Sequence, residues 1–286
     1  MTVMHPIAEP VLSDSQFLKL AEIVRQDSGI VLTTAKRGLM VARLNRRLRA
    51  LRLPDYQAYC DRLEGMDGPA ERRHLMSAIT TNVTAFFREA HHFRSLATEI
   101  LPPLAAKAKA GRRLRLWSAA CSSGEEAYSI AITLLETFPD AARHDVRILA
   151  SDIDPGMIAR AAAGRYARDG LRPVGVRRLQ RFFTRDGESC TVRDELRGIM
   201  RFAELNLHDP WPFSGRFDVI FCRNAVIYFE TGARQRLWQR FARQIAPGGY
   251  LFIGHCERLD GPAADLFEPA GATCYRRNST PPPPLP

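Results

Sequence analysis

The strongest constraint on the fold is a change of hydrophobic pattern near Gly111. Beyond this residue, short apolar runs alternate with stretches whose apolar residues recur every three or four positions. The runs cover residues 114–119, 146–150, 217–222 and 250–253, and the intervening stretches cover 125–138, 155–163 and 231–245. Strands that alternate with helices indicate βαβ units and a mostly parallel sheet. We therefore expect an α/β domain over residues 91–277.

The first 90 residues show a different pattern, with apolar positions at helical spacing and no alternating strand-like runs. A first helix is expected over 13–27, with Ser13 as N-cap and Gly29 as its stop. Further helices are expected over 33–52, 55–63 and 68–79. These segments predict a separate, small all-α domain over residues 10–90.

Two segments fall outside these patterns. Residues 168–200 are rich in glycine and include a strand-like stretch at 189–192, so we expect an inserted small β subdomain made of a helix and a hairpin. Residues 278–286 are rich in proline and are expected to be a disordered tail.

Charge and composition narrow the class of protein. The formal net charge is +10 and comes mainly from arginine, which indicates nucleic acid, an acidic protein surface or a compositional habit as alternatives. Six scattered cysteines form no C-x-x-C pair and are expected to be free thiols. No apolar stretch approaches the ~20 residues of a membrane span, and the first ten residues lack a signal-peptide core, so a cytoplasmic location is expected.

A ligand site is predicted where two of the expected strands end. Small residues at 118–124 join a strand to a helix without a G-x-G-x-x-G pattern or a phosphate-binding lysine, which disfavours a pyrophosphate ligand. Glu125 and Glu126 either complement the helix dipole or face a cationic ligand group. We assign Asp154 as the N-cap of the next helix and Asp152 as a ribose acceptor. Acidic residues at the ends of both strands, without a phosphate-binding loop, fit S-adenosylmethionine, which has ribose hydroxyl groups and a positive charge but no phosphate.

Motifs in one consistent order resemble the CheR family of chemotaxis receptor methyltransferases. They are Asn82-Val83-Thr84-Ala85-Phe86-Phe87-Arg88-Glu89, residues 117–126 and 151–154, residues 221–229, Pro247-Gly248-Gly249 and Gly254-His255-Cys256-Glu257. The resemblance implies a helical domain followed by a Rossmann-like class I methyltransferase domain with a small β subdomain. It also implies methyl transfer from S-adenosyl-L-methionine to glutamate side chains on the cytoplasmic helices of chemoreceptors, giving γ-methyl esters and S-adenosyl-L-homocysteine.

The resemblance also implies roles for individual residues. Arg88 and Tyr228 match the two polar residues beside the reactive methyl group. The implied cofactor contacts are Asn82, Thr84, Arg88, Glu125, Asp152, Asn206, Leu207, Arg223 and Asn224. From periodicity alone, the exposed end of a core stripe is the favoured interpretation of Arg88, and the resemblance reverses it. For Tyr228, a buried aromatic residue is the alternative.

The expected reaction needs no general base, because a glutamate is already ionised at neutral pH, with a reference pKa near ~4.3. Catalysis then rests on alignment and on removal of water from the nucleophile. The chain accordingly shows no obvious catalytic base beside the predicted site. His255 is expected to be a packing residue, and His74 and the pair His91-His92 lack a metal-binding spacing, so no metal site is expected.

One predicted helix has only positively charged residues on its polar face. Between residues 36 and 52 there are seven basic residues and no acid. We expect Arg43, Arg46, Arg47 and Arg49 to lie away from the apolar seam and to bind an acidic receptor helix. A merely solvated face is the alternative, and nucleic acid is not expected because no interleaved aromatic residues accompany the charges.

Two further expectations concern the substrate. Only eight residues separate Phe183 from Val192, as in relatives that do not bind a C-terminal pentapeptide of the receptor, so independence of that tether is expected. The alternatives are a methyltransferase of the same fold acting on RNA or a small molecule, and a non-enzymatic module that senses the cofactor.

Overall fold

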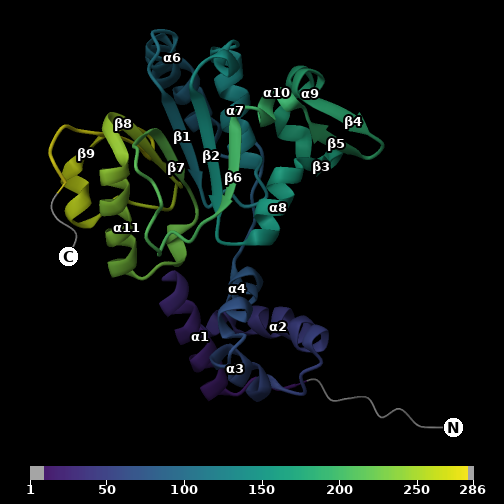
Figure 1. Ribbon diagram of the computed structural model, residues 1–286. Helices are drawn as coiled ribbons and strands as arrows, with labels where there is room; N and C mark the ends of the chain where they lie inside the picture. The colour runs from purple at the N-terminus through teal and green to yellow at the C-terminus, as the bar shows by residue number, and fades with distance from the viewer. Residues whose placement is uncertain (1–9, 283–286) are drawn as a thin grey trace. The chain divides into compact units, whose positions relative to one another are not determined.

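The computed structural model describes residues 10–282 and divides into two compact units between Thr81 and Asn82 (Figure 1). The expected boundary at residue 90 is therefore too late. The reason is that Phe86 is buried in the core of the second unit, together with Phe93 and the helices that follow. Residues 82–90 thus belong to the α/β unit.

The first unit is entirely helical. Its helices are α1 (Asp14–Ser28), the 3-10 turn η1 (Thr34–Lys36), α2 (Arg37–Leu51), α3 (Tyr56–Glu64) and α4 (Gly68–Ile79). Ser13 and Gln16 form a capping box at the start of α1, and Gly29 ends the helix in the left-handed conformation, as predicted. The four predicted helices are confirmed.

A buried ion pair joins two helices of this unit. Arg47 of α2 donates to both carboxylate oxygens of Glu71 of α4, at 2.8 and 2.6 Å, and Glu71 is only 3% exposed. Arg43 of the same helix donates to the carbonyl oxygens of Ala78 and Thr80. We expected all four arginines of α2 to lie away from the apolar seam and to be available to a receptor helix, but Arg43 and Arg47 instead donate to acceptors on and after α4.

The second unit is built on a seven-stranded sheet with the strand order β6-β2-β1-β7-β8-β10-β9. Its strands are β1 (Leu114–Ala119), β2 (Val146–Asp152), β6 (Met200–Glu204), β7 (Phe217–Cys222), β8 (Ile245–Ile253), β9 (Phe267–Gly271) and β10 (Cys274–Arg277). Strands β6, β2, β1, β7 and β8 are parallel, and β10 is antiparallel to β8 and β9. The predicted mostly parallel sheet is confirmed, with three strands that the sequence did not reveal: β6, β9 and β10.

Helices cover both faces of this sheet. Along β1, Leu114 and Leu116 enter one core cluster, and Trp117 and Ala119 enter another. The first cluster contains residues of α6 (Leu101–Lys109) and α7 (Glu125–Thr137), and the second contains residues of α11 (Thr231–Gln244). The α5 helix (Ala90–Ser95) and the π-helical turn η2 (Leu96–Ile100) precede α6, the η3 turn (Ala141–Arg143) follows α7, and α8 (Pro155–Ala163) follows β2.

The insertion begins and ends a few residues earlier than predicted, and it contains one more strand than the expected hairpin. It forms a three-stranded sheet of order β3-β5-β4, whose strands are β3 (Arg165–Ala167), β4 (Phe183–Asp186) and β5 (Ser189–Val192). The η4 turn (Arg168–Val174) and α9 (Val176–Phe182) lie between β3 and β4, and α10 (Asp194–Arg197) follows β5. The expected bounds of 168–200 miss β3, which is too short to show alternation, and they include Met200, which starts β6 of the main sheet.

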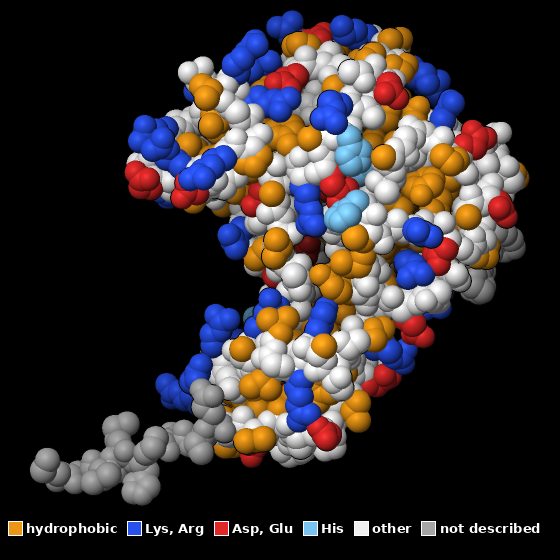
Figure 2. Space-filling view, turned by 180° about the vertical axis from the view of Figure 1, so that it is seen from behind, with side chains coloured by type: hydrophobic (Ala, Val, Ile, Leu, Met, Phe, Trp, Pro, Cys, Tyr) orange, Lys and Arg blue, Asp and Glu red, His pale blue; other side chains and the backbone are white. Residues whose placement is uncertain are grey.

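Several smaller expectations are settled by the part of the chain that the structure describes. All six cysteines are free. No helix within residues 10–282 combines the length and the apolar character that a bilayer span requires. Of the predicted tail, residues 283–286 lie outside the described part. Basic and acidic side chains are intermingled over the face seen in Figure 2, so the net charge of +10 does not gather in one patch there.

The Arg47–Glu71 pair predicts a position-specific loss of stability along α2. Breaking a buried pair leaves an uncompensated charge, so Arg47→Ala should lower the free energy of unfolding of the helical unit by about 3 kcal/mol at pH 7. Arg46→Ala, an exposed neighbour, should change it by less than about 0.5 kcal/mol. Urea titration with hydrogen exchange of residues 14–79 measures both, and equal effects would contradict the role of the pair.

The same pair predicts a pH dependence. Burial opposes ionisation of Glu71, but the hydrogen bond and the positive charge of Arg47, together with Tyr59 and His74 nearby, outweigh it, so the pKa of the Glu71 carboxyl group is lowered. A lowered pKa contributes stability above the unfolded value of ~4.3, and this contribution is lost as the pH falls below it. The difference between wild type and Arg47→Ala should therefore shrink below about pH 4.

Candidate active site

The carboxyl ends of the parallel strands meet at one edge of the main sheet. The strand order changes direction at β1, which pairs with β2 on one side and β7 on the other. In open α/β sheets, ligands bind outside the carboxyl ends at such a switch point. Asp152, at the end of β2, and Arg223 and Asn224, just after β7, lie at this edge. The predicted ligand site is thus placed on the edge that this fold uses.

Backbone strain is concentrated around this edge. Of the seven non-glycine residues with positive φ within residues 10–282, five flank the site: Phe87, Glu89, Ala120, Ser122 and Asn224, with φ between 50° and 62°. Such conformations cost about 1–3 kcal/mol each and persist only where neighbouring interactions hold them.

Asp152 is fixed in orientation by the backbone. Its two carboxylate oxygens accept hydrogen bonds from the N–H groups of Ser122 (2.8 Å) and Asp154 (2.9 Å). Burial raises the pKa of Asp152, which is 5% exposed. Each oxygen retains a further lone pair that a hydroxyl group can use. Asp154 accepts from the N–H of Gly156, so its predicted role as N-cap of α8 is confirmed.

The loop between β1 and α7 is held from two sides. The Ser123 hydroxyl donates to the Glu125 carboxylate at 2.7 Å, and Tyr166 of β3 donates to the carbonyl of Ser123 at 2.7 Å. Gly124 has a φ of 98°, and a Cβ there would lie 2.9 Å from that of Ala161. The small β subdomain therefore contributes directly to the shape of this loop, which sequence reasoning missed.

The segment from Asn82 to Arg88 reaches the same loops. The Asn82 side-chain amide donates to Asp154 at 3.0 Å, and its carbonyl accepts from the Ser122 hydroxyl at 2.9 Å. Arg88 is half-buried, and its guanidinium donates to the carbonyl of Val83 at 3.2 Å. Thr84 lies between them and is also half-buried. The structure thus brings Asn82 together with the loops that follow β1 and β2.

Arg223 has a structural role that the sequence did not predict. Its side chain is 2% exposed and donates to Glu126 (3.1 Å) and to the carbonyl oxygen of Arg88 (2.6 Å). It also forms an ion pair with Glu89 at 3.2 Å. Both terminal nitrogens of the guanidinium are therefore used by partners within the protein. Burial raises the pKa of Glu126, whose carboxylate also accepts from the Ser118 hydroxyl.

Glu257 holds the turn after β7. Its carboxylate accepts from the N–H groups of Asn224 (3.0 Å), Val226 (3.0 Å) and Gly254 (2.6 Å), and it is 4% exposed. Burial raises the pKa of Glu257. A Cβ at Gly254 would lie 2.5 Å from the Asn224 amide nitrogen, so only glycine fits there. The sequence signal that could have revealed Glu257 is an acid four residues after the end of a buried strand.

The remaining predicted residues lie nearby on other loops. Tyr228 lies in the η5 turn (Val226–Tyr228) and is half-buried. The N–H of Leu205 donates to the carbonyl of Asp152, which places Asn206 and Leu207 beside the end of β2. Leu207 is buried in the core cluster that contains α11, and its carbonyl accepts from Arg240.

The structure places an acid beside the histidine pair, which the spacing in the sequence did not indicate. Ligand atoms of Glu89, His91 and His92 lie within 4.8 Å of one another, because Glu89 adopts a positive φ just before α5. His255 is not a packing residue: it is exposed, and its Nδ1 lies 3.0 Å from Glu89 Oε1.

The donor groups fit S-adenosylmethionine. Glu125 and Asp152 are acids at two neighbouring loops, and no lysine follows Gly124 in a phosphate-binding position. Such a set suits a ligand with hydroxyl groups and a positive charge but no phosphate. The small residues and backbone N–H groups of the β1–α7 loop allow close approach of such a ligand.

The contacts of Glu257 predict its effect on the site. Glu257→Gln replaces one acceptor oxygen by an NH₂ group that faces backbone N–H donors, so the turn with Asn224 should lose its support. Losing charge-assisted hydrogen bonds of this kind costs about 1.5–3 kcal/mol, or a ~10–100-fold weaker affinity for S-adenosylmethionine. Calorimetric titration measures this, with Glu268→Gln on the exposed surface of β9 as control. An unchanged affinity in Glu257→Gln would contradict the assigned role.

Comparison with known proteins agrees with this geometry. A family model described as CheR methyltransferase, SAM binding domain, matches residues 82–276. A second, described as CheR methyltransferase, all-alpha domain, matches residues 15–80. The junction between these matches coincides with the division between Thr81 and Asn82.

Similar whole proteins share most of the chain. A probable chemotaxis protein methyltransferase of Rhizobium etli is 43% identical over 89% of this chain and 96% of its own length. The chemotaxis protein methyltransferases of Escherichia coli and Klebsiella aerogenes are 41% and 40% identical, over 87% and 92% of this chain and 86% and 90% of theirs. The chain therefore belongs to the CheR methyltransferase family and is an S-adenosylmethionine-dependent methyltransferase.

Proposed function

We propose that this enzyme methylates glutamate side chains on the cytoplasmic helices of chemoreceptors, giving γ-methyl esters and S-adenosylhomocysteine, in the cytoplasm. The names of the relatives, chemotaxis protein methyltransferases, support a substrate in a chemotaxis pathway. The site itself supports a carboxylate as the methyl acceptor.

The observation that carries this proposal is the preorganised Arg88. Its backbone is fixed on both sides, since the N–H of Phe87 donates to the Ser129 hydroxyl at 2.9 Å and Arg223 donates to the carbonyl of Arg88. Its guanidinium, tethered to Val83, is half-buried at the edge of the sheet. A fixed cation in this position attracts and orients an incoming carboxylate.

The reaction depends mainly on alignment of the acceptor carboxylate with the methyl group of the cofactor. Bound S-adenosylmethionine supplies a sulfonium methyl group, and its C–S bond breaks as a carboxylate oxygen forms the new C–O bond. No proton moves, because the acceptor is ionised at neutral pH. Arg88 orients this carboxylate without holding it as a tight ion pair. The negative charge of the carboxylate is neutralised in the transition state, so a strong ion pair in the ground state would raise the barrier. Tyr228 donates a hydrogen bond that directs the attacking oxygen.

The cofactor is proposed to be held mainly by acids and backbone. Asp152 would accept from the ribose hydroxyls, and Glu125 would face the positively charged amino acid end. Asn82, Thr84, Arg88, Asn206, Leu207, Arg223 and Asn224 would complete the pocket. These assignments are supported by the location of the residues on loops at the carboxyl edge of the main sheet.

The receptor helix is proposed to bind the exposed arginines of α2. Arg46 and Arg49 are exposed, whereas Arg43 and Arg47 contribute to the fold of the helical unit. Methylated receptor regions are rich in glutamate, so a basic face raises the encounter rate with them. In the small subdomain, β4 and β5 are joined by Gly187 and Glu188 alone. This short hairpin supports independence of a receptor C-terminal pentapeptide.

The proposal predicts a base-labile product. Purified protein with labelled S-adenosylmethionine should label a receptor cytoplasmic fragment, and mild alkali should release the label as methanol because it is held as an ester. The rate should be equal for fragments with and without their C-terminal tails. Label that resists alkali would contradict the ester, and loss of labelling without the tail would contradict independence of the tether.

Arg88 should affect turnover more than cofactor binding. Arg88→Ala removes the cation that orients the acceptor, so kcat should fall by roughly 100-fold while the Kd for S-adenosylmethionine changes by only a few-fold. Initial rates with receptor fragment and calorimetric titration separate the two quantities. Normal turnover in this variant would remove its proposed role.

The arginines of α2 should affect only recognition of the receptor. The double variant Arg46→Glu, Arg49→Glu should raise KM for the receptor fragment by ~10-fold or more at low salt, and the effect should shrink at high salt. Its kcat and its cofactor affinity should match wild type. Arg112→Glu, an exposed charge in the α/β unit, is the matched control, and an equal rise in KM there would show a nonspecific charge effect.

A further inference from the structure

A second cluster of side chains lies beside the methyl-transfer site and has no part in the proposed chemistry. Glu89 caps the start of α5, and His91 and His92 are its second and third residues. All three offer ligand atoms within 4.8 Å of one another. We propose that these residues bind a divalent transition-metal ion of the zinc class.

The hydrogen bonds of His92 leave one nitrogen facing Glu89. Its Nε2 lies 2.9 Å from the Thr273 hydroxyl, which can donate or accept, and 3.0 Å from the carbonyl oxygen of Ala272, which can only accept. The contact with the carbonyl assigns the proton of the neutral ring to Nε2. The lone pair is then on Nδ1, which is buried and has no hydrogen-bond partner within the described residues. This is the arrangement of a metal-ligating histidine, whose other nitrogen donates to a backbone carbonyl.

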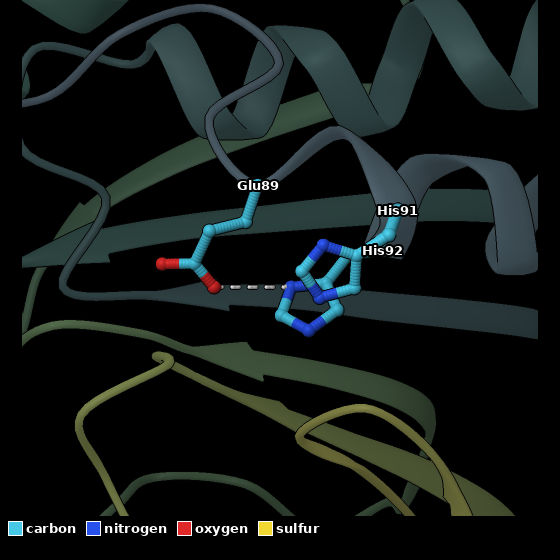
Figure 3. A group of neighbouring side chains, drawn as sticks. All are labelled: Glu89, His91 and His92. Carbon is cyan, nitrogen blue, oxygen red and sulfur yellow. Dashed lines mark ion pairs between the residues drawn. The ribbon is translucent and has the colours of Figure 1, made fainter.

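The lone pair points toward an anion. Nδ1 of His92 lies 3.6 Å from Glu89 Oε2, as drawn in Figure 3, and in the assigned tautomer it has no hydrogen to donate. A cation bound by both atoms would relieve the repulsion between this lone pair and the carboxylate, which Arg223 offsets only on the side of Glu89. Nε2 of His91, on a ring whose centroid is 4.2 Å from that of His92, is a third buried atom without a hydrogen-bond partner in the described part.

The spacing of His92 and Glu89 suits a zinc ion, and the ligand atom of His91 lies within 4.8 Å of both. Bonds of about 2.0–2.1 Å in a tetrahedral site separate neighbouring ligand atoms by about 3.3 Å, close to the 3.6 Å already present between His92 and Glu89. Two imidazoles and one carboxylate form a common three-ligand zinc set that leaves the fourth position for water. Imidazole nitrogens disfavour Mg²⁺ and Ca²⁺, which take oxygen ligands.

The positive charge of Arg223 lowers the affinity of the cluster for a metal ion but does not prevent binding. Its guanidinium lies 3.2 Å from Glu89 Oε2 and opposes a second cation. Glu126 also pairs with Arg223, so the two carboxylates around this arginine leave one net negative charge before an ion binds. His91 is half-buried, which gives solvent access to the cluster. Since Arg223 also holds the carbonyl of Arg88, an ion on Glu89 would act on the group that positions the active site.

Zinc binding by the full-length, tag-free protein after chelator treatment tests the proposal. Competition with a chromophoric zinc indicator should give one equivalent of Zn²⁺ per chain. Glu89→Gln and His91→Asn should each weaken the affinity at least 10-fold, because each removes one of three ligands. His74→Asn, an exposed histidine of the helical unit, is the matched control and should bind zinc as wild type does.

Circular dichroism and thermal unfolding should show that the variants are folded. If Glu89→Gln does not fold, the zinc affinity of His91→Asn alone tests the proposal. Absorption bands of the Co²⁺-loaded protein in the visible region should also decrease in His91→Asn. The proposal is overturned if wild type binds no zinc, or if the cluster variants bind it as tightly as His74→Asn does.

Discussion

The site depends on one buried guanidinium. Arg223 follows β7 and reaches Glu126 at the start of α7, Glu89 before α5 and the backbone carbonyl of Arg88. A buried charge is tolerated only with such partners, because an unpaired one would cost several kcal/mol. Since its partners come from two separate segments, residues 88–89 and the start of α7, satisfying this single charge joins both of them to the turn after β7.

The same logic extends to a second buried charge. Glu257 accepts three backbone N–H groups and so fixes the turn from Asn224 to Val226, while Gly254 provides the space that this turn requires. These two charges lie where the backbone is strained, at Phe87, Glu89 and Asn224. The strain is therefore held in place by paired charges, and the loops are rigid before a ligand binds. An enzyme that works by alignment rather than by proton transfer needs this preorganisation.

Much of the framework could be predicted from sequence because it follows from local patterns. Alternating apolar runs predicted the parallel strands β1, β2 and β7. Parallel strands bring their carboxyl ends to one edge, and so a ligand site was expected where β1 and β2 end, with Asp152 as a ribose acceptor. The capping of α1 by Ser13 and of α8 by Asp154 was also visible, because a cap and its helix are adjacent in the chain.

Partners distant in sequence could not be predicted. Nothing near Arg223 reveals that it pairs with Glu126, and the acid-free α2 concealed that Glu71 of another helix neutralises Arg47. The short β3 gave no periodicity of its own. Glu89, Arg223 and His255 likewise meet only in the folded chain. For Arg223 and Arg47, the pattern within one segment was interpreted without the oppositely charged residue that the fold places beside it.

The account is tested most directly by the kinetics of Arg223→Lys. Lysine keeps the charge, but its single ammonium group cannot reach Glu126, Glu89 and the carbonyl of Arg88 at once. In a variant that remains folded, kcat should fall by at least ~10-fold and cofactor affinity should weaken, whereas Arg185→Lys on the exposed hairpin should match wild type. A folded Arg223→Lys enzyme with the turnover and cofactor affinity of wild type would contradict the central role of this guanidinium.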